Sequence, residues 1–212
     1  MPRGMRASGS PSGRPRPGGS PSESSPSETS ASDPEARARQ ICLRLLTVAP
    51  RTRAELAAAL SRHGVPREAA EAVLGRFTDV GLIDDAAFAR AWVESRHYSR
   101  GLSRRSLSAE LRRHGVDAEE IREAVSTLNP EQEVATARRL VEQKMASTRG
   151  QPPEARIRRA AGTLARKGYP PGLVFRLIKE ALEQEGSDEI VGLELDPDQY
   201  LDPDADPHDA LG

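Results

Sequence analysis

The sequence LRRHGV at residues 111–116 recurs twice with small changes, as LSRHGV at residues 60–65 and LARKGY at residues 164–169. The three copies lie roughly 50 residues apart. Each glycine follows a leucine by four residues and comes directly after a histidine or a lysine. Ten residues beyond each glycine lies another aliphatic residue, which is Leu74, Val125 or Ile178. A fixed internal period of this length is typical of a modular helical architecture.

The residues before each glycine indicate helices. Thr52-Arg53-Ala54-Glu55 is a capping-box pattern that predicts the start of a helix. Leu56 and Leu60 then lie one turn apart on a single face, and Gly64 suits a left-handed helix end. Alternating runs of β-branched residues, which would indicate strands, are absent. We therefore expect an all-α fold of three tandem three-helix repeats, helix-turn-helix-like units in an elongated array with disordered termini.

Helix-starting prolines and helix-breaking glycines predict where the units begin and end. The first repeat is expected over residues 34–84, the second over 85–129 and the third over 130–185. Residues 1–33 form a leader rich in Ser, Pro, Gly and Arg, and residues 186–212 form an acidic tail. Neither segment has enough apolar side chains to offset the entropy of ordering, so we expect both to be disordered.

The charge of the chain is distributed unevenly. The formal net charge is −1, but residues 186–212 carry nine carboxylates and no Lys or Arg. The leader holds four arginines against three acids, which leaves a net charge of +7 for the repeats. A basic body joined to an acidic tail predicts a polyanionic partner.

Several classes of protein are disfavoured by what the sequence lacks. No run of 18 apolar residues is present to span a membrane, and the leader does not resemble a secretory signal, so we expect a cytoplasmic protein. The single cysteine, Cys42, excludes an intrachain disulfide. Asp84 and Asp85 have no third ligand at metal-binding spacing, so one of them is expected to cap a helix. Phosphate-binding loops and nucleophile elbows are absent, and we expect no enzyme and no cofactor.

Basic side chains gather around the second and third glycine turns, and Glu110 is the only acid between residues 96 and 113. Such clusters bind phosphates strongly without reading a base sequence. They also suit acidic patches on a protein. The candidate contacts are Arg96, Arg100, Arg104, Arg105, Arg112, Arg113, Arg156, Arg158, Arg159, Arg166 and Lys167.

One block of sequence carries a family resemblance. It comprises Gly81-Leu82-Ile83-Asp84-Asp85, Phe88-Ala89, Trp92-Val93, Arg96, Gly101, Glu110-Leu111-Arg112 and Gly115-Val116, with Glu55-Leu56 upstream and Arg166-Lys167-Gly168-Tyr169 downstream. With these residues, roughly residues 36–183 resemble the RecX family of bacterial recombination regulators, and the middle of this range is the most specific part.

The resemblance implies both a fold and an activity. Members of this family are built from three tandem three-helix repeats and are not enzymes. They bind the recombinase RecA, chiefly as its filament on single-stranded DNA, and curb strand exchange, ATP hydrolysis and assisted repressor cleavage. The resemblance therefore implies RecA and its single-stranded DNA filament as partners, with a role in DNA repair, recombination and the SOS response. The basic repeats also predict weak direct binding to DNA.

Two other functions fit the same helical pattern. Three-helix units with a glycine turn resemble helix-turn-helix modules, so a DNA-binding transcription regulator is the main alternative. A helical adaptor whose basic faces bind only protein is the other. Separately, the acidic tail at residues 186–212 is either a solubilising segment or a competitor that covers the basic repeats.

Overall fold

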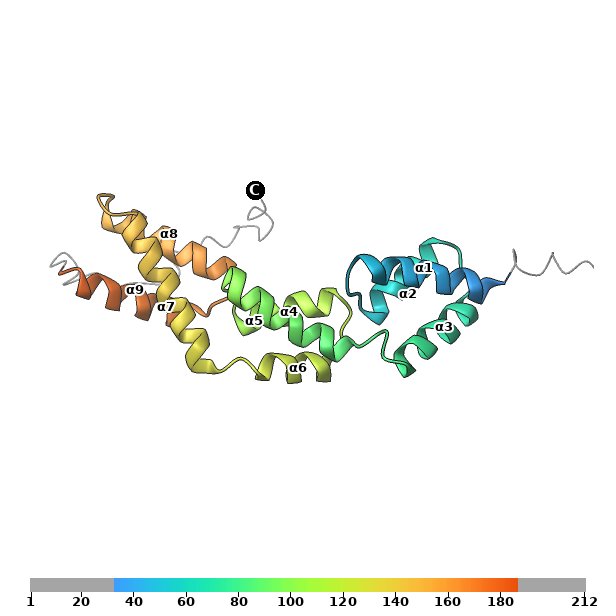
Figure 1. The fold of residues 1–212 in the computed structure, drawn as a ribbon. Helices are drawn as coiled ribbons and strands as arrows, with labels where there is room; N and C mark the ends of the chain where they lie inside the picture. Colours follow the sequence, from blue (N-terminus) through green and yellow to red (C-terminus); the bar gives the residue numbers. More distant parts are fainter. Residues whose placement is uncertain (1–32, 187–212) are drawn as a thin grey trace, which may run out of the picture. The chain divides into compact units, whose positions relative to one another are not determined.

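The computed structural model describes residues 33–186, and this part of the chain contains nine α-helices and no strand (Figure 1). The predicted states of residues 1–32 and 187–212 lie outside the described range. The helices are α1 (Pro34–Val48), α2 (Arg53–Arg62), α3 (Arg67–Asp79), α4 (Asp85–Arg100), α5 (Arg104–Arg113), α6 (Ala118–Ser126), α7 (Pro130–Ser147), α8 (Pro153–Arg166) and α9 (Pro171–Gln184).

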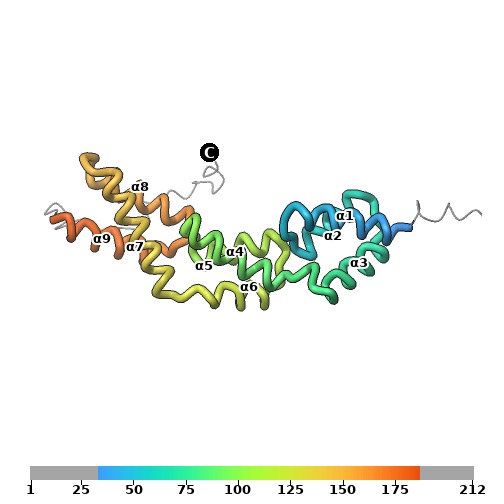
Figure 2. The backbone as a smooth tube through the Cα atoms, viewed as in Figure 1, coloured from blue at the N-terminus to red at the C-terminus, as the bar shows by residue number. Residues whose placement is uncertain are grey.

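Each set of three consecutive helices surrounds its own apolar core. The backbone tube in Figure 2 passes through the three sets in the order of the sequence. Burying one leucine side chain stabilises a core by about 1.5–3 kcal/mol. The all-α, three-repeat fold predicted from the sequence is confirmed. The cores include Leu56, Leu60 and Leu74 in the first set, Leu107, Leu111 and Ile121 in the second, and Leu164, Val174 and Ile178 in the third.

The recurring sequence, LxxHGV in two copies and LARKGY in the third, is a helix-ending motif. Gly64 has a φ of 69°, and its counterparts at 115 and 168 have φ of 76° and 81°. In the first copy the N–H of Val65 donates to the carbonyl of Leu60 at 3.1 Å, and the N–H of Gly64 donates to that of Ser61 at 2.9 Å. These two bonds define a Schellman motif, in which the leucine and the residue after the glycine also make an apolar contact. The same two bonds form at Gly115 and Gly168, so the fixed distance from leucine to glycine in each copy follows from the geometry of the helix end.

The starts of the helices differ among the repeats. Thr52 forms the predicted capping box, because the Glu55 N–H donates to its hydroxyl at 3.1 Å and its own N–H donates to the Glu55 carboxylate at 3.2 Å. Asp84 caps α4 by accepting a bond from the Ala87 N–H at 2.7 Å. In contrast, α8 begins with Pro152 as its N-cap and Pro153 as its first residue, and no side chain caps it.

The first glycine turn has an internal partner of its own. The Arg37 guanidinium, from α1, donates to the carbonyl of His63 at 2.7 Å. A Cβ built on Gly64 would meet nothing within 4 Å, in contrast to those on Gly115 and Gly168. Among the helices of residues 33–186, none combines the length and the apolar run needed to cross a lipid bilayer.

Candidate functional site

Consecutive repeats meet through a shared arrangement, which we call a joint. The first turn of the middle helix of one repeat packs against the glycine turn of the next repeat. In the first joint, residues 52–55 at the start of α2 meet His114-Gly115 and Asp85. In the second joint, residues 103–106 at the start of α5 meet Lys167-Gly168 and Glu133.

Three polar contacts hold the first joint. The Thr52 hydroxyl donates to the His114 carbonyl at 2.6 Å, and the Arg53 N–H donates to the Asp85 carboxylate at 2.9 Å. His114 Nδ1 lies 2.9 Å from a carboxylate oxygen of Glu55. A Cβ on Gly115 would overlap the Cβ of Ala54, so close approach as well as positive φ requires glycine here.

The second joint repeats this plan with different side chains. The Ser103 N–H donates to the Lys167 carbonyl at 2.9 Å, and the Arg104 N–H donates to the Glu133 carboxylate at 2.8 Å. A Cβ on Gly168 would lie 2.6 Å from the Ser103 hydroxyl oxygen and closer still to that of Ser106. In both joints, a carboxylate from the following repeat therefore binds the first N–H of the middle helix, where the helix dipole favours negative charge.

Carboxylates crowd the first joint. Burial raises the pKa of Asp85, and the neighbouring charges of Asp84 and Glu55 raise it further, against the opposing effect of Arg53. Burial also raises the pKa of Glu120, with Asp85 as the next contributor. The charge that accumulates here is negative, so this joint does not favour an anion.

Cations crowd the second joint. Burial lowers the pKa of Lys167, and the positive charges of Arg100 and Arg166 lower it further. The Lys167 ammonium donates to the Arg100 carbonyl, which ties the end of α8 to the end of α4. None of the ion pairs formed within residues 33–186 includes any of these three side chains. We call Arg100, Arg166 and Lys167 the cation cluster; a phosphate there would relieve their mutual repulsion.

Arg96 lies apart from this cluster. Its guanidinium carbon is 4.2 Å from the centroid of the Trp92 ring, a cation–π contact. The Trp92 indole N–H donates to the Glu110 carboxylate at 2.8 Å, and its ring centroid lies 4.3 Å from that of His114. Trp92 therefore bridges α4, α5 and the first joint, and it holds Arg96 in a fixed direction.

Arg156 differs from the other predicted contacts because it is buried. Its guanidinium donates to the Glu185 carboxylate at 2.5 Å and to the Met145 carbonyl at 3.2 Å, and only 7% of the residue is exposed. The sequence pattern gave no sign of this, since the charge of an arginine does not show which way the side chain points. Its role in the structure is to hold α7, α8 and the end of α9 together.

The remaining predicted arginines lie outside the cation cluster. Arg104 is half-buried at the start of α5, and its backbone belongs to the second joint. The others have exposed side chains: Arg105 lies at the start of α5, Arg112 and Arg113 at its end, and Arg158 and Arg159 in the first half of α8. Arg159 donates to the Gln151 amide oxygen.

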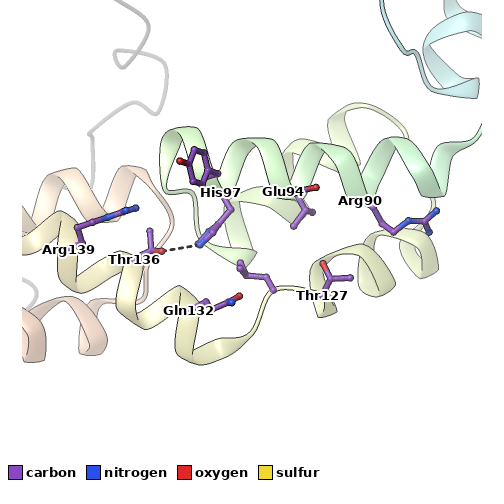
Figure 3. Close-up of a pocket in the computed structure, with 10 residues that line it drawn as sticks. Arg90, Glu94, His97, Thr127, Gln132, Thr136 and Arg139 are labelled. Carbon is purple, nitrogen blue, oxygen red and sulfur yellow. Dashed lines mark hydrogen bonds between the residues drawn. The ribbon is translucent and has the colours of Figure 1, made fainter.

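A groove of about 600 Å³ lies between α4 and α7, and the residues that follow α6 also line it (Figure 3). Figure 3 shows Arg90, Glu94 and His97 on α4, with Thr136 and Arg139 opposite them on α7. Within residues 33–186, no group of three His, Cys, Asp or Glu side chains could hold a metal ion. Sequence reasoning did not select the groove residues, because they come from segments some 40 residues apart that only the fold brings together.

Family models match all three sets of helices. The first three-helix domain of RecX matches residues 38–77, the second matches residues 84–125 and the third matches residues 131–178. The chain belongs to the RecX family. Each matched range falls on one set of three helices, so the RecX domains correspond to the three cores described above.

Individual relatives agree with this assignment. The regulatory protein RecX of Thermobifida fusca is 61% identical over 151 residues, which cover 71% of this chain and 82% of the relative. The regulatory protein RecX of Streptomyces coelicolor is 58% identical over 156 residues, covering 74% and 83%. This RecX-family chain is therefore similar to proteins named as regulators over most of their length.

Solved RecX structures share the fold. A crystal structure of a regulatory protein RecX superimposes with a TM-score of 0.63 at 25% identity, covering 71% of this chain and 75% of the other. RecX from Lactobacillus salivarius gives the same TM-score at 17% identity and is covered over 97% of its length. At that level of identity the second likeness concerns the fold alone.

Proposed function

We propose that this RecX-family chain binds RecA, chiefly as a filament on single-stranded DNA, and lowers its recombinase, ATPase and co-protease activities. Membership of the RecX family supports the choice of partner, through the activity that the resemblance implies. Among the features of the structure, the cation cluster carries the proposal. Lys167 follows Arg166 at the end of α8 and donates to the carbonyl of Arg100 at the end of α4, and none of the three side chains belongs to an ion pair formed within residues 33–186. The site of action is the cytoplasm, where RecA filaments form.

The joints suit a protein that makes several contacts along one filament. Each joint fixes two repeats through backbone and side-chain hydrogen bonds, so the exposed basic side chains of different repeats are presented together. Weak contacts made by linked units add through their effective concentration. The candidate contacts of the second and third repeats would then act as one surface toward phosphates of the DNA or carboxylates of the recombinase.

The proposed mechanism involves binding without catalysis. Arginine clamps phosphates and carboxylates through two parallel hydrogen bonds, which fixes orientation as well as charge. A chain held in this way across neighbouring RecA subunits would hinder the movements that ATP hydrolysis and strand exchange need. No bond in the substrate is made or broken by the chain itself.

The helix-turn-helix alternative is less well supported by the geometry. In such modules the last helix of each unit would read the major groove. Here α6 and α9 pair exposed basic residues with acids on the same helix, Arg122 with Glu119 at 2.5 Å and Lys179 with Glu183 at 3.9 Å. Paired cations on these faces do not favour approach to duplex DNA. Protection of a palindromic promoter sequence in the absence of RecA would support this alternative.

A direct assay tests the proposal. Purified chain is added at increasing amounts to RecA with single-stranded DNA, and ATP hydrolysis and strand exchange are followed. We expect both rates to fall until the filament is saturated. Unchanged rates at saturating amounts would overturn the proposal. Adding the chain before or after filament assembly then separates a block on growth from an effect on finished filaments.

A further inference from the structure

The groove between α4 and α7 has features that the cation cluster alone does not explain. Its floor includes Val93 and Leu128, which are 2% and 7% exposed. His97 lies across it, with Nε2 3.1 Å from the Thr136 hydroxyl and Nδ1 2.9 Å from the Leu102 carbonyl (Figure 3). Because both ring nitrogens have partners, this histidine fixes the width of the groove and is not itself a loose binding group.

Tyr98 lines the same groove and is 87% exposed. It is the most exposed of the large hydrophobic residues in the described part of the chain. An aromatic ring left in solvent beside a cavity gives a flat apolar face without a partner. Nucleobases stack on such faces, and stacking tolerates any base because every base has a π-face.

The groove also carries positive charge at its rim. Arg90 and Arg139 are exposed, and neither belongs to an ion pair formed within residues 33–186. Arg139 also lies close enough to Tyr169 to lower its pKa, which burial and Glu133 raise. The Tyr169 hydroxyl donates to the Gly101 carbonyl at 3.0 Å, one residue after Arg100. A Cβ on Gly101 would lie 3.0 Å from Leu140 and 3.4 Å from Thr136 on α7, so the end of the groove that Thr136 lines adjoins the backbone beside Arg100.

Exposed polar side chains along the groove match the edges of bases. The Gln132 amide both donates and accepts hydrogen bonds, and the Glu94 carboxylate accepts them from exocyclic amino groups. A carboxylate in this position disfavours a phosphate deep in the groove. The charges therefore orient a nucleotide with its base inward and its phosphate toward Arg139.

We propose that the α4–α7 groove binds one unpaired nucleotide of single-stranded DNA, with its base stacked on Tyr98 and the flanking phosphates on Arg139 and the cation cluster. The inference rests on the proposed function and specifies where the chain would touch the DNA of the filament. A volume of about 600 Å³ is ample for a base and its sugar. Bases paired in a duplex cannot enter, so the groove selects single strands.

The test measures binding without RecA. Fluorescence anisotropy of a labelled oligo-dT of about 15 nucleotides is recorded for the full chain and for Tyr98→Ala and Tyr98→Phe. We expect Tyr98→Ala to weaken binding about tenfold and Tyr98→Phe to stay within about twofold, because phenylalanine keeps the stacking face. Since Tyr98 is exposed, both variants should retain the wild-type helical content and melting temperature.

Binding of Tyr98→Ala at the wild-type level would overturn the proposal, as would an equal loss for Tyr98→Ala and Tyr98→Phe. A tenfold loss that appeared equally on a duplex of the same length would also overturn it, because the groove admits only unpaired bases. The ATPase assay with wild-type chain and RecA is run in parallel. If the wild-type chain inhibits ATP hydrolysis but Tyr98→Ala binds the oligonucleotide as the wild type does, the nucleotide site is ruled out and the proposed function stands.

Discussion

The two joints of this chain share one hydrogen-bonding plan and have opposite charge. In each, the first N–H of a middle helix donates to a carboxylate of the next repeat, at 2.9 Å to Asp85 and at 2.8 Å to Glu133. Around this common frame, the first joint gathers carboxylates and the second gathers Arg100, Arg166 and Lys167.

The comparison distinguishes the contacts that hold adjacent repeats together from the charged side chains that the repeats expose. The glycine turn and the bond from the first N–H of the middle helix to a carboxylate occur in both joints, so they serve assembly. The surrounding charges are not needed for assembly, since one joint forms among carboxylates and the other among cations. The second joint is therefore the one suited to a polyanion, and the first is a matched internal control.

The largest expected effect concerns the glycine turns. Gly115→Ala adds a Cβ that overlaps Ala54 in a positive-φ conformation, so we expect a loss of about 3 kcal/mol from overpacking and backbone strain together. Gly64→Ala adds only the strain, about 1 kcal/mol, because nothing lies within 4 Å. Urea unfolding followed by circular dichroism compares the two. Equal losses would show that the joint does not depend on close approach.

The cation cluster gives the next largest effect. Arg100→Gln with Lys167→Gln should weaken binding to single-stranded DNA about tenfold in low salt, since each lost phosphate contact is worth about 0.7 kcal/mol. The slope of log affinity against log salt should fall by about 1.4. Arg44→Gln with Arg62→Gln removes the same charge from exposed positions in the first repeat and serves as the control. An identical loss in both double variants would mean that only total charge matters.

Variants of Asp85 test the contact that both joints share, the bond from the first N–H of the middle helix to a carboxylate. Asp85→Ala removes the acceptor for the Arg53 N–H and should cost about 1 kcal/mol, whereas Asp85→Asn keeps an acceptor oxygen. The pKa of Asp85 is raised in the folded chain above its usual 3.8, so the folded state holds its proton more tightly. The contribution of this group to stability therefore declines as pH rises from about the usual value through the raised one. Urea titrations across that range should show this decline in the wild type and not in Asp85→Asn.

The smallest expected effect concerns the acidic tail. If residues 186–212 compete for the cation cluster, removing them should raise affinity for single-stranded DNA about threefold at low salt and hardly at all at high salt. The gain should disappear in the Arg100→Gln, Lys167→Gln background. An unchanged affinity at low salt would identify the tail as a solubilising segment.

Local signals in the sequence predicted the elements well. The capping box at Thr52, the left-handed glycines and the cap at Asp84 all depend on neighbours within a few residues, and the structure confirms them. The partner of Asp85 was not predictable in the same way, because the Arg53 N–H lies 32 residues away.

The candidate contacts were harder to assign than the helices. Counting arginines located the basic region but did not distinguish buried Arg156 from the exposed arginines of the same helix. Nor did it indicate Tyr98 or Arg139, which line one groove only because α4 and α7 lie next to each other. The position of a residue along a helix predicts the face on which its side chain lies. The packing of the next repeat determines which of those faces remain exposed.

The two prolines at the start of α8 have a consequence for growth of the array. A fourth repeat would need an N–H at position 153 for its carboxylate, and proline has none. At the opposite end, the His63 carbonyl, which a preceding repeat would occupy, already accepts a bond from Arg37. The third repeat thus lacks this donor, and the corresponding acceptor of the first repeat already has a partner. Two copies placed end to end could therefore not form the full set of hydrogen bonds that links the repeats, which disfavours an open-ended fibre.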